Sequence, residues 1–169
     1  QDRRAGSPAP FCRFFPDSYR ISLPRGFHSS ICARRGKVTL LKILVFSDSH
    51  RYTGGMIQAI EEQQPDLVVH LGDLQRDAEE LALLYPKLSM VTVPGNCDGW
   101  TTDPLERQFM VCGKRVLLSH GHIWHVKQGY DAALRAARNA GAHLLLFGHT
   151  HRPCCFQEPD GPVSHTHLR

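Results

Sequence analysis

The sequence lacks any apolar run that approaches the ~20 residues of a membrane-spanning helix. It also lacks a C-x-x-C unit and a clean signal peptide, both of which would point to other classes of protein. We therefore expect a soluble, cytoplasmic protein whose cysteines are reduced thiols. These are Cys12, Cys32, Cys97, Cys112, Cys154 and Cys155.

Acidic residues are scarce in the first 37 positions. Eight Lys and Arg stand there against two Asp, a net charge of +6, which leaves −2 for the other 132 residues of a chain whose total is +4. The basic balance therefore belongs to this extension, and nucleic-acid binding is not indicated for the rest. Residues 1–37 contain several Pro and Gly and show no strand or helix period, so we expect a disordered or non-native extension, with an organelle transit peptide as the alternative.

Strand and helix patterns alternate from Val38 onward. Apolar and β-branched runs predict strands at 38–46, 66–71, 88–93 and 143–147, and residues 107–111 and 114–119 predict a hairpin. Apolar residues at helical spacing predict helices at 54–64, 75–85 and 129–141. This order is typical of one α/β domain with a mixed sheet, which we place at residues 38–169.

Metal-ligand side chains follow five of the predicted strands. Because the carboxyl ends of parallel strands form the crevice of an open α/β sheet, five such ends can meet in one place. Seven donors are too many for one tetrahedral zinc site, and their mixture suits two ions that share a carboxylate. Taken alone, Asp73 could cap a helix and Asn96 could be a turn residue, but the ordered set favours a metal centre. The donors are Asp48, His50, Asp73, Asn96, His120, His149 and His151.

The ordered motifs D-x-H, G-D, G-N-C-D, H-G-H and G-H-T-H resemble those of the calcineurin-like metallophosphoesterases, and of the small YfcE-type phosphodiesterases in particular. The resemblance covers about residues 40–160. It implies a four-layer α/β/β/α sandwich of two mixed sheets. It further implies that Asp48, His50 and His151 hold one metal ion, that Asn96, His120 and His149 hold the other, and that Asp73 bridges them.

The activity implied by the resemblance is hydrolysis of a small phosphate ester, with a phosphodiester preferred. A metal-bridging hydroxide would attack phosphorus in line, and Asp98 would orient a metal ligand. Two divalent ions are expected, with Mn first and Ni, Co, Fe or Zn as alternatives. The chain could also form a homo-oligomer.

Two features depart from the family pattern. Cys97 stands where larger relatives have a histidine, and a thiol cannot neutralise phosphate charge as an imidazolium does, so His122 could take part of that role. The sequence stops at EPDGPVSHTHLR, with room for one strand through CCFQE, so we expect a sandwich that is incomplete at its C-terminal strands. We expect His165 and His167 to be tail residues and not ligands.

Two other functional interpretations stay open. One is a non-catalytic scaffold, as in the retromer subunit that shares this fold, although every ligand type is present here. The other is an inactive fragment that does not fold. Trp100 and Trp124 could frame a nucleobase, but packing is favoured for both.

Overall fold

The computed structural model describes residues 11–15, 18–22, 41–152, 154–157 and 163–166. One sheet has the order β1-β2-β3-β4-β5, in which β3, β4 and β5 are parallel and β1 and β2 add as an antiparallel hairpin. Its strands are β1 (Phe11–Phe15), β2 (Ser18–Ser22), β3 (Lys42–Phe46), β4 (Leu67–His70) and β5 (Ser89–Thr92).

The second sheet has the order β6-β7-β8-β10-β9. Its three central strands are parallel, and an antiparallel strand closes each edge. The strands are β6 (Glu106–Val111), β7 (Lys114–Ser119), β8 (Leu144–Phe147), β9 (Cys154–Gln157) and β10 (Val163–Thr166). Both sheets are therefore mixed.

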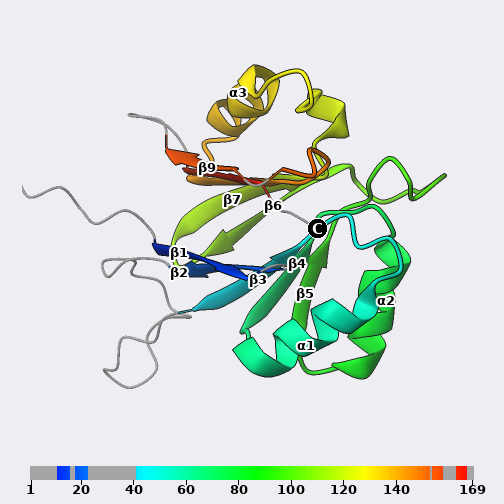
Figure 1. Cartoon of the computed structure of the whole chain (residues 1–169). Coiled ribbons are helices and arrows are strands. Elements are labelled where there is room, and N and C mark those ends of the chain that lie inside the picture. The colour runs from blue at the N-terminus through cyan, green and yellow to red at the C-terminus, as the bar shows by residue number, and fades with distance from the viewer. Residues whose placement is uncertain (1–10, 16–17, 23–40, 153, 158–162, 167–169) are drawn as a thin grey trace, which may run out of the picture.

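Helices cover the outer face of each sheet, which gives the four layers seen in Figure 1. Helices α1 (Thr53–Gln63) and α2 (Gln75–Leu84) pack on the first sheet, and α3 (Asp131–Asn139) packs on the second. A short 3-10 turn, η1 (His122–Trp124), follows β7. Alternating side chains explain the layering, because successive residues of a strand point to opposite faces. In β3, Ile43 and Val45 enter the core between the sheets, whereas Leu44 and Phe46 pack against α1 and α2.

The α/β/β/α sandwich of two mixed sheets is confirmed, and each predicted helix and strand is present within a few residues of its expected bounds. The structure differs from expectation at both ends. Strands β1 and β2 are an exception to the lack of regular structure expected for residues 1–37, and the rest of this range lies outside the described residues. Strand β10 was not predicted, and it places His165 between β8 and β9, while His167 lies outside the described residues.

The structure also shows the state of four cysteines and whether its helices could span a membrane. Cys112 is disulfide-bonded, so the expectation of reduced thiols is wrong for this residue, whereas Cys97, Cys154 and Cys155 are thiols. Among the described helices, none has the length and apolar character needed to cross a membrane.

Candidate metal centre

Six of the seven predicted ligands converge at the carboxyl ends of β3, β4, β7 and β8. Backbone hydrogen bonds join the loops that follow these strands: the N–H of Asp48 donates to the carbonyl of Gly72 at 2.9 Å, and that of Gly148 donates to the carbonyl of His120 at 2.9 Å. Each bond lies within one sheet: the first joins the loops after β3 and β4, and the second joins the loops after β7 and β8. Neighbouring loops of each sheet are thus fixed to one another before any side chain is considered.

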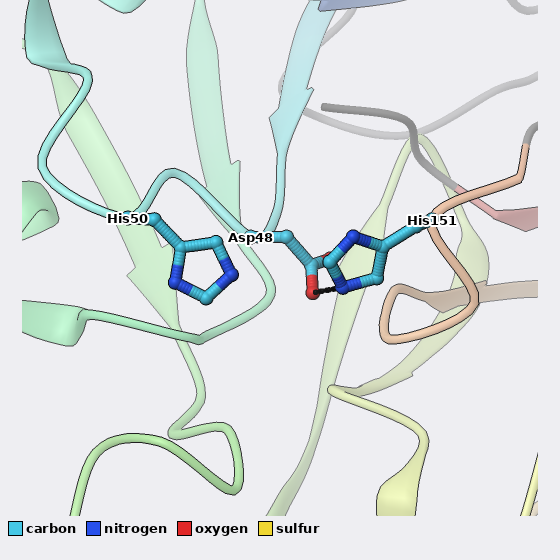
Figure 2. Close-up of side chains that lie close together, drawn as sticks. All are labelled: Asp48, His50 and His151. Carbon is cyan, nitrogen blue, oxygen red and sulfur yellow. Dashed lines mark ion pairs between the residues drawn. The ribbon is translucent and has the colours of Figure 1, made fainter.

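The first donor group consists of Asp48, His50 and His151, whose ligand atoms lie within 4.8 Å of one another. Figure 2 shows the three side chains facing a common point, although they come from loops about 100 residues apart in the chain. His151 Nε2 lies 3.1 Å from Asp48 Oδ1, and the rings of His50 and His151 are stacked with centroids 6.0 Å apart. The carboxylate is fixed through its other oxygen, since Oδ2 accepts from Ser47 Oγ at 2.6 Å.

The second donor group consists of Asp73, His120 and His149, again within 4.8 Å. His120 is fully buried, and its Nδ1–H donates to the carbonyl of Leu71 at 2.8 Å. This bond leaves Nε2 to face the site, as a histidine that ligates a metal usually does. Nε2 lies 3.1 Å from His149 Nδ1 and 3.4 Å from Asp73 Oδ2.

The two groups are neighbours, and His120 lies between them. Its Nε2 is 3.9 Å from Asp48 Oδ1 as well as 3.4 Å from Asp73 Oδ2. Asp48 Oδ1 is buried and accepts no hydrogen bond among the described residues, although Nε2 of His151 lies 3.1 Å from it. A buried carboxylate oxygen of this kind is costly without a cation. The donors therefore fit divalent metal ions.

Ionisation of the second group is strongly coupled. Burial raises the pKa of Asp73, but hydrogen bonds from His120 and from the Cys97 backbone more than offset it, and the net pKa lies far below its usual range. Burial lowers the pKa of His120, yet the carboxylates of Asp73 and Asp48 raise it above its ordinary value. Burial and the nearby His120 lower the pKa of His149 to about 4. The negative charges of Asp73 and Asp48 thus favour a positive charge beside them, and a bound metal cation would neutralise these carboxylates.

Five of these six donors adopt left-handed backbone conformations that are uncommon for residues other than glycine. The φ angles range from 44° at His50 to 69° at His149. Asp48, Asp73 and His151 lie between these values. Such outliers persist only where surrounding contacts enforce them, and they cluster at functional sites.

Two glycines allow the close approach of these loops. A Cβ on Gly95 would lie 2.2 Å from Asp73 Oδ1, and one on Gly148 would lie 1.9 Å from Ser47 Oγ and 3.1 Å from Asp48 Oδ2. Any side chain at either position would therefore displace a carboxylate of the site.

Asp98 does not point at the donors but holds the loops that carry them. Its Oδ2 accepts from the N–H of Asp73 at 3.0 Å and of Gly95 at 2.6 Å, and its Oδ1 accepts from those of Leu74 at 2.9 Å and Gln75 at 2.5 Å. One carboxylate thus caps the start of α2 and joins the ends of β4 and β5. Asp73, considered as a cap from sequence, donates its N–H instead.

Asn96 and Cys97 lie exposed at the rim, next to Asp73. Asn96 Nδ2 donates to Cys97 Sγ at 3.3 Å, and the Cys97 N–H donates to Asp73 Oδ1 at 2.9 Å. Burial, followed by the hydrogen bond and charge of Asp73, raises the pKa of the Cys97 thiol. The sulfur is therefore a neutral thiol at pH 7, which is a weak nucleophile.

His122 follows His120 on η1 and lies beside the second group. Its ring centroid is 5.5 Å from that of His120 and 6.2 Å from that of His149. Its Nδ1 is buried without a hydrogen-bond partner among the described residues. Burial and the neighbouring His120 lower its pKa, so the imidazole is neutral at pH 7.

The two tryptophans have different environments. Trp124 is buried and packs in the α3 layer, as expected, whereas Trp100 is fully exposed on the loop after Asp98, so the expectation that it packs is wrong.

A set of residues that sequence analysis did not single out lies under the site: Ser49, His70 and Asp77 are joined by hydrogen bonds. His70 ends an apolar strand, and no periodicity separated it from the core.

Comparison with known proteins agrees with this geometry. Residues 41–165 match the model of the calcineurin-like phosphoesterase superfamily domain. A probable metallophosphoesterase of Bacillus subtilis is 32% identical over 115 residues, which are 66% of this chain and 64% of that protein. The chain thus spans slightly less than two thirds of the length of this relative.

Solved structures share the fold. A predicted phosphoesterase from Streptococcus pneumoniae superposes with a TM-score of 0.61 at 23% identity, over 73% of this chain and 70% of that one. Vps29 from Entamoeba histolytica, solved with Zn²⁺, superposes with a TM-score of 0.59 at 19% identity, over 73% and 72%. The ordered donors, the two-sheet sandwich and the match over residues 41–165 lead to one conclusion: the chain belongs to the calcineurin-like phosphoesterase superfamily.

Proposed function

We propose that this protein is a binuclear metal-dependent phosphoesterase that prefers phosphodiesters. The observation that supports the proposal is the pair of adjacent three-donor groups, together with the buried Asp48 oxygen that accepts no hydrogen bond among the described residues. Asp48, His50 and His151 would hold one ion, His120 and His149 the other, and Asp73 would bridge. Asn96, at the rim beside Asp73, would complete the second set once its Oδ1 turns toward the site.

Bound divalent ions, with Mn as the first candidate, would supply an activated hydroxide and neutralise phosphate oxygens. The protein's own part is to hold the donors in place. Asp98 fixes the N–H of Asp73, and the Leu71 carbonyl fixes the ring of His120. His122 presents a neutral imidazole with an unpartnered nitrogen, which suits contact with a phosphate oxygen or proton transfer to a leaving group.

The test is hydrolysis of an aryl phosphodiester and an aryl phosphomonoester by the full chain, repeated with Mn, Ni, Co, Zn and Mg. We expect metal-dependent turnover that is faster on the diester. An Asp73→Asn variant serves as the control for contaminating activity. Absence of turnover with every metal, in a protein that binds two ions, would contradict the proposal.

A non-catalytic scaffold is the second candidate. The likeness to Vps29 in fold favours it, although a likeness at 19% identity shows the fold alone. The same assay separates the two, because a scaffold would bind metal without turnover.

A further inference from the structure

We propose that a buried hydrogen-bond relay, formed by His70, Ser49 and Asp77, positions the ligands of the metal centre. These three are positioning residues, since they touch no donor atom directly. The inference rests on the proposed metal centre and adds residues to it.

The relay begins at the end of β4. His70 is fully buried, and the N–H of Gly72 donates to its Nδ1 at 3.3 Å. With Nδ1 as an acceptor, a neutral ring carries its proton on Nε2. Nε2 lies 3.1 Å from Ser49 Oγ, so it donates to that hydroxyl. His70 thereby links the residue before Asp73 to the residue between Asp48 and His50.

The direction of the next bond follows from the first. A serine hydroxyl has one proton and can accept at the same oxygen. Ser49 Oγ accepts from His70 and donates to Asp77 Oδ2 at 2.7 Å. Each donor in the chain has its own acceptor, so the network is fully satisfied and fixes one arrangement.

Asp77 anchors the relay in the first turn of α2. The same Oδ2 accepts from the N–H of Arg51 at 2.8 Å. Arg51 has φ 73° and His50 has φ 44°, so this carboxylate holds the left-handed segment that presents His50. The side chain is 5% exposed, and its bonds act in an environment of low dielectric.

A purely structural role does not explain the polar choice. His70 adjoins Val68 and Val69 in a strand whose other side chains are apolar, and burying an imidazole there requires partners that an aliphatic residue would not need. The polar relay adds directional hydrogen bonds. These bonds join the Asp48–His50 loop to the residue before Asp73 and to α2 in one defined arrangement. A loop position defined in this way is what ligand geometry requires.

The test measures binding of Mn²⁺ and Zn²⁺ to the metal-free full chain by calorimetry and by competition with a chelator. Ser49→Ala removes the central hydroxyl, and we expect the Kd of at least one ion to rise about 10- to 100-fold. Ser49→Thr keeps a hydroxyl and should restore the Kd to within about threefold. Thr101→Ala is the matched control, because it removes an exposed hydroxyl that accepts the N–H of Asp103 and should leave Kd unchanged.

A second variant guards against misfolding. His70→Asn keeps an acceptor near the Gly72 N–H but is too short to reach Ser49, so it should raise Kd as Ser49→Ala does. Thermal melts without metal identify which variants are folded at the assay temperature. The inference is overturned if folded Ser49→Ala binds both ions with wild-type affinity, if Ser49→Thr fails to restore binding, or if Thr101→Ala weakens it equally.

Failure of this inference is distinguishable from failure of the proposed function. A wild-type chain that binds two ions but hydrolyses no phosphate ester contradicts the function and leaves the relay to be judged on affinity alone. A wild-type chain that hydrolyses phosphodiesters while Ser49→Ala retains full affinity contradicts only the relay. A chain that binds no divalent ion contradicts both.

Discussion

Replacing Asp98 by Asn tests whether one carboxylate joins the ends of β4 and β5. The two oxygens accept four backbone N–H groups, from Asp73, Gly95, Leu74 and Gln75. Asparagine has nearly the same shape but keeps only one acceptor oxygen, so two N–H groups would face an NH₂ donor. Hydrogen bonds to charged groups contribute about 1.5–3 kcal/mol each. Because Asp98 is half-buried, we take the lower end and expect a loss of about 3 kcal/mol.

The assay is urea unfolding of the metal-free protein at pH 7, followed by circular dichroism. Asp103→Asn is the matched control, since Asp103 accepts from one glutamine side chain and forms an exposed pair with Arg107 at 3.5 Å. Exposed pairs contribute about 0–1 kcal/mol, so this variant should change stability by less than ~1 kcal/mol. A loss below ~1 kcal/mol for Asp98→Asn as well would refute the role assigned to the carboxylate.

Three further predictions concern the site. Asp73→Asn should lower bound metal from about two ions to one or fewer per chain and abolish turnover, because a bridging carboxylate serves both sites; full occupancy by elemental analysis would contradict this. Burial lowers the pKa of His70 from 6.5 to about 4, despite the opposing charge of Asp77. The unfolded chain therefore binds more protons between these values, and the metal-free protein should lose roughly 3 kcal/mol as the pH falls from 6.5 to 4, a slope that should diminish in His70→Asn. Cys97→Ser should reduce turnover by less than about tenfold, or ~1.4 kcal/mol of barrier, whereas a loss of several orders of magnitude with normal metal content would make the thiol a nucleophile.

The donors could be predicted from sequence because each one lies within a few residues of the end of an apolar strand. Asp48 comes two residues after Phe46 at the end of β3, and His149 comes two after Phe147 at the end of β8. Once the strands are recognised, the parallel registers bring their ends together. The order of the motifs then indicated the family. In the structure, six of the predicted donors form two groups that could hold a metal ion, and Asn96 lies at the rim.

The supporting residues could not be predicted in the same way. His70 continues the apolar run of β4 and has no feature that separates it from a core residue. Its partner Ser49 lies 21 positions before it in the chain and 28 positions before Asp77. The role of Asp98 depends on four N–H groups, three of which lie on another loop. Strand β10 was missed because VSHT is short and polar, and it is specified by pairing with β8 and β9 and not by its own pattern.

The left-handed backbone of the donor loops gives a reason for the hydrogen bonds that Asp98 and Asp77 accept. Five donors with positive φ each cost on the order of 1 kcal/mol relative to ordinary conformations, a sum comparable to the 5–15 kcal/mol that stabilises a typical domain. In the metal-free chain, contacts at the loops themselves offset that cost. Asp98 fixes the loop of Asp73, and Asp77 fixes the loop of His50. Metal binding then meets donors that are already oriented, so less of its free energy is lost in ordering the loops. The polar bonds beneath the site would therefore help to set metal affinity, although neither Asp98 nor Asp77 is a proposed ligand.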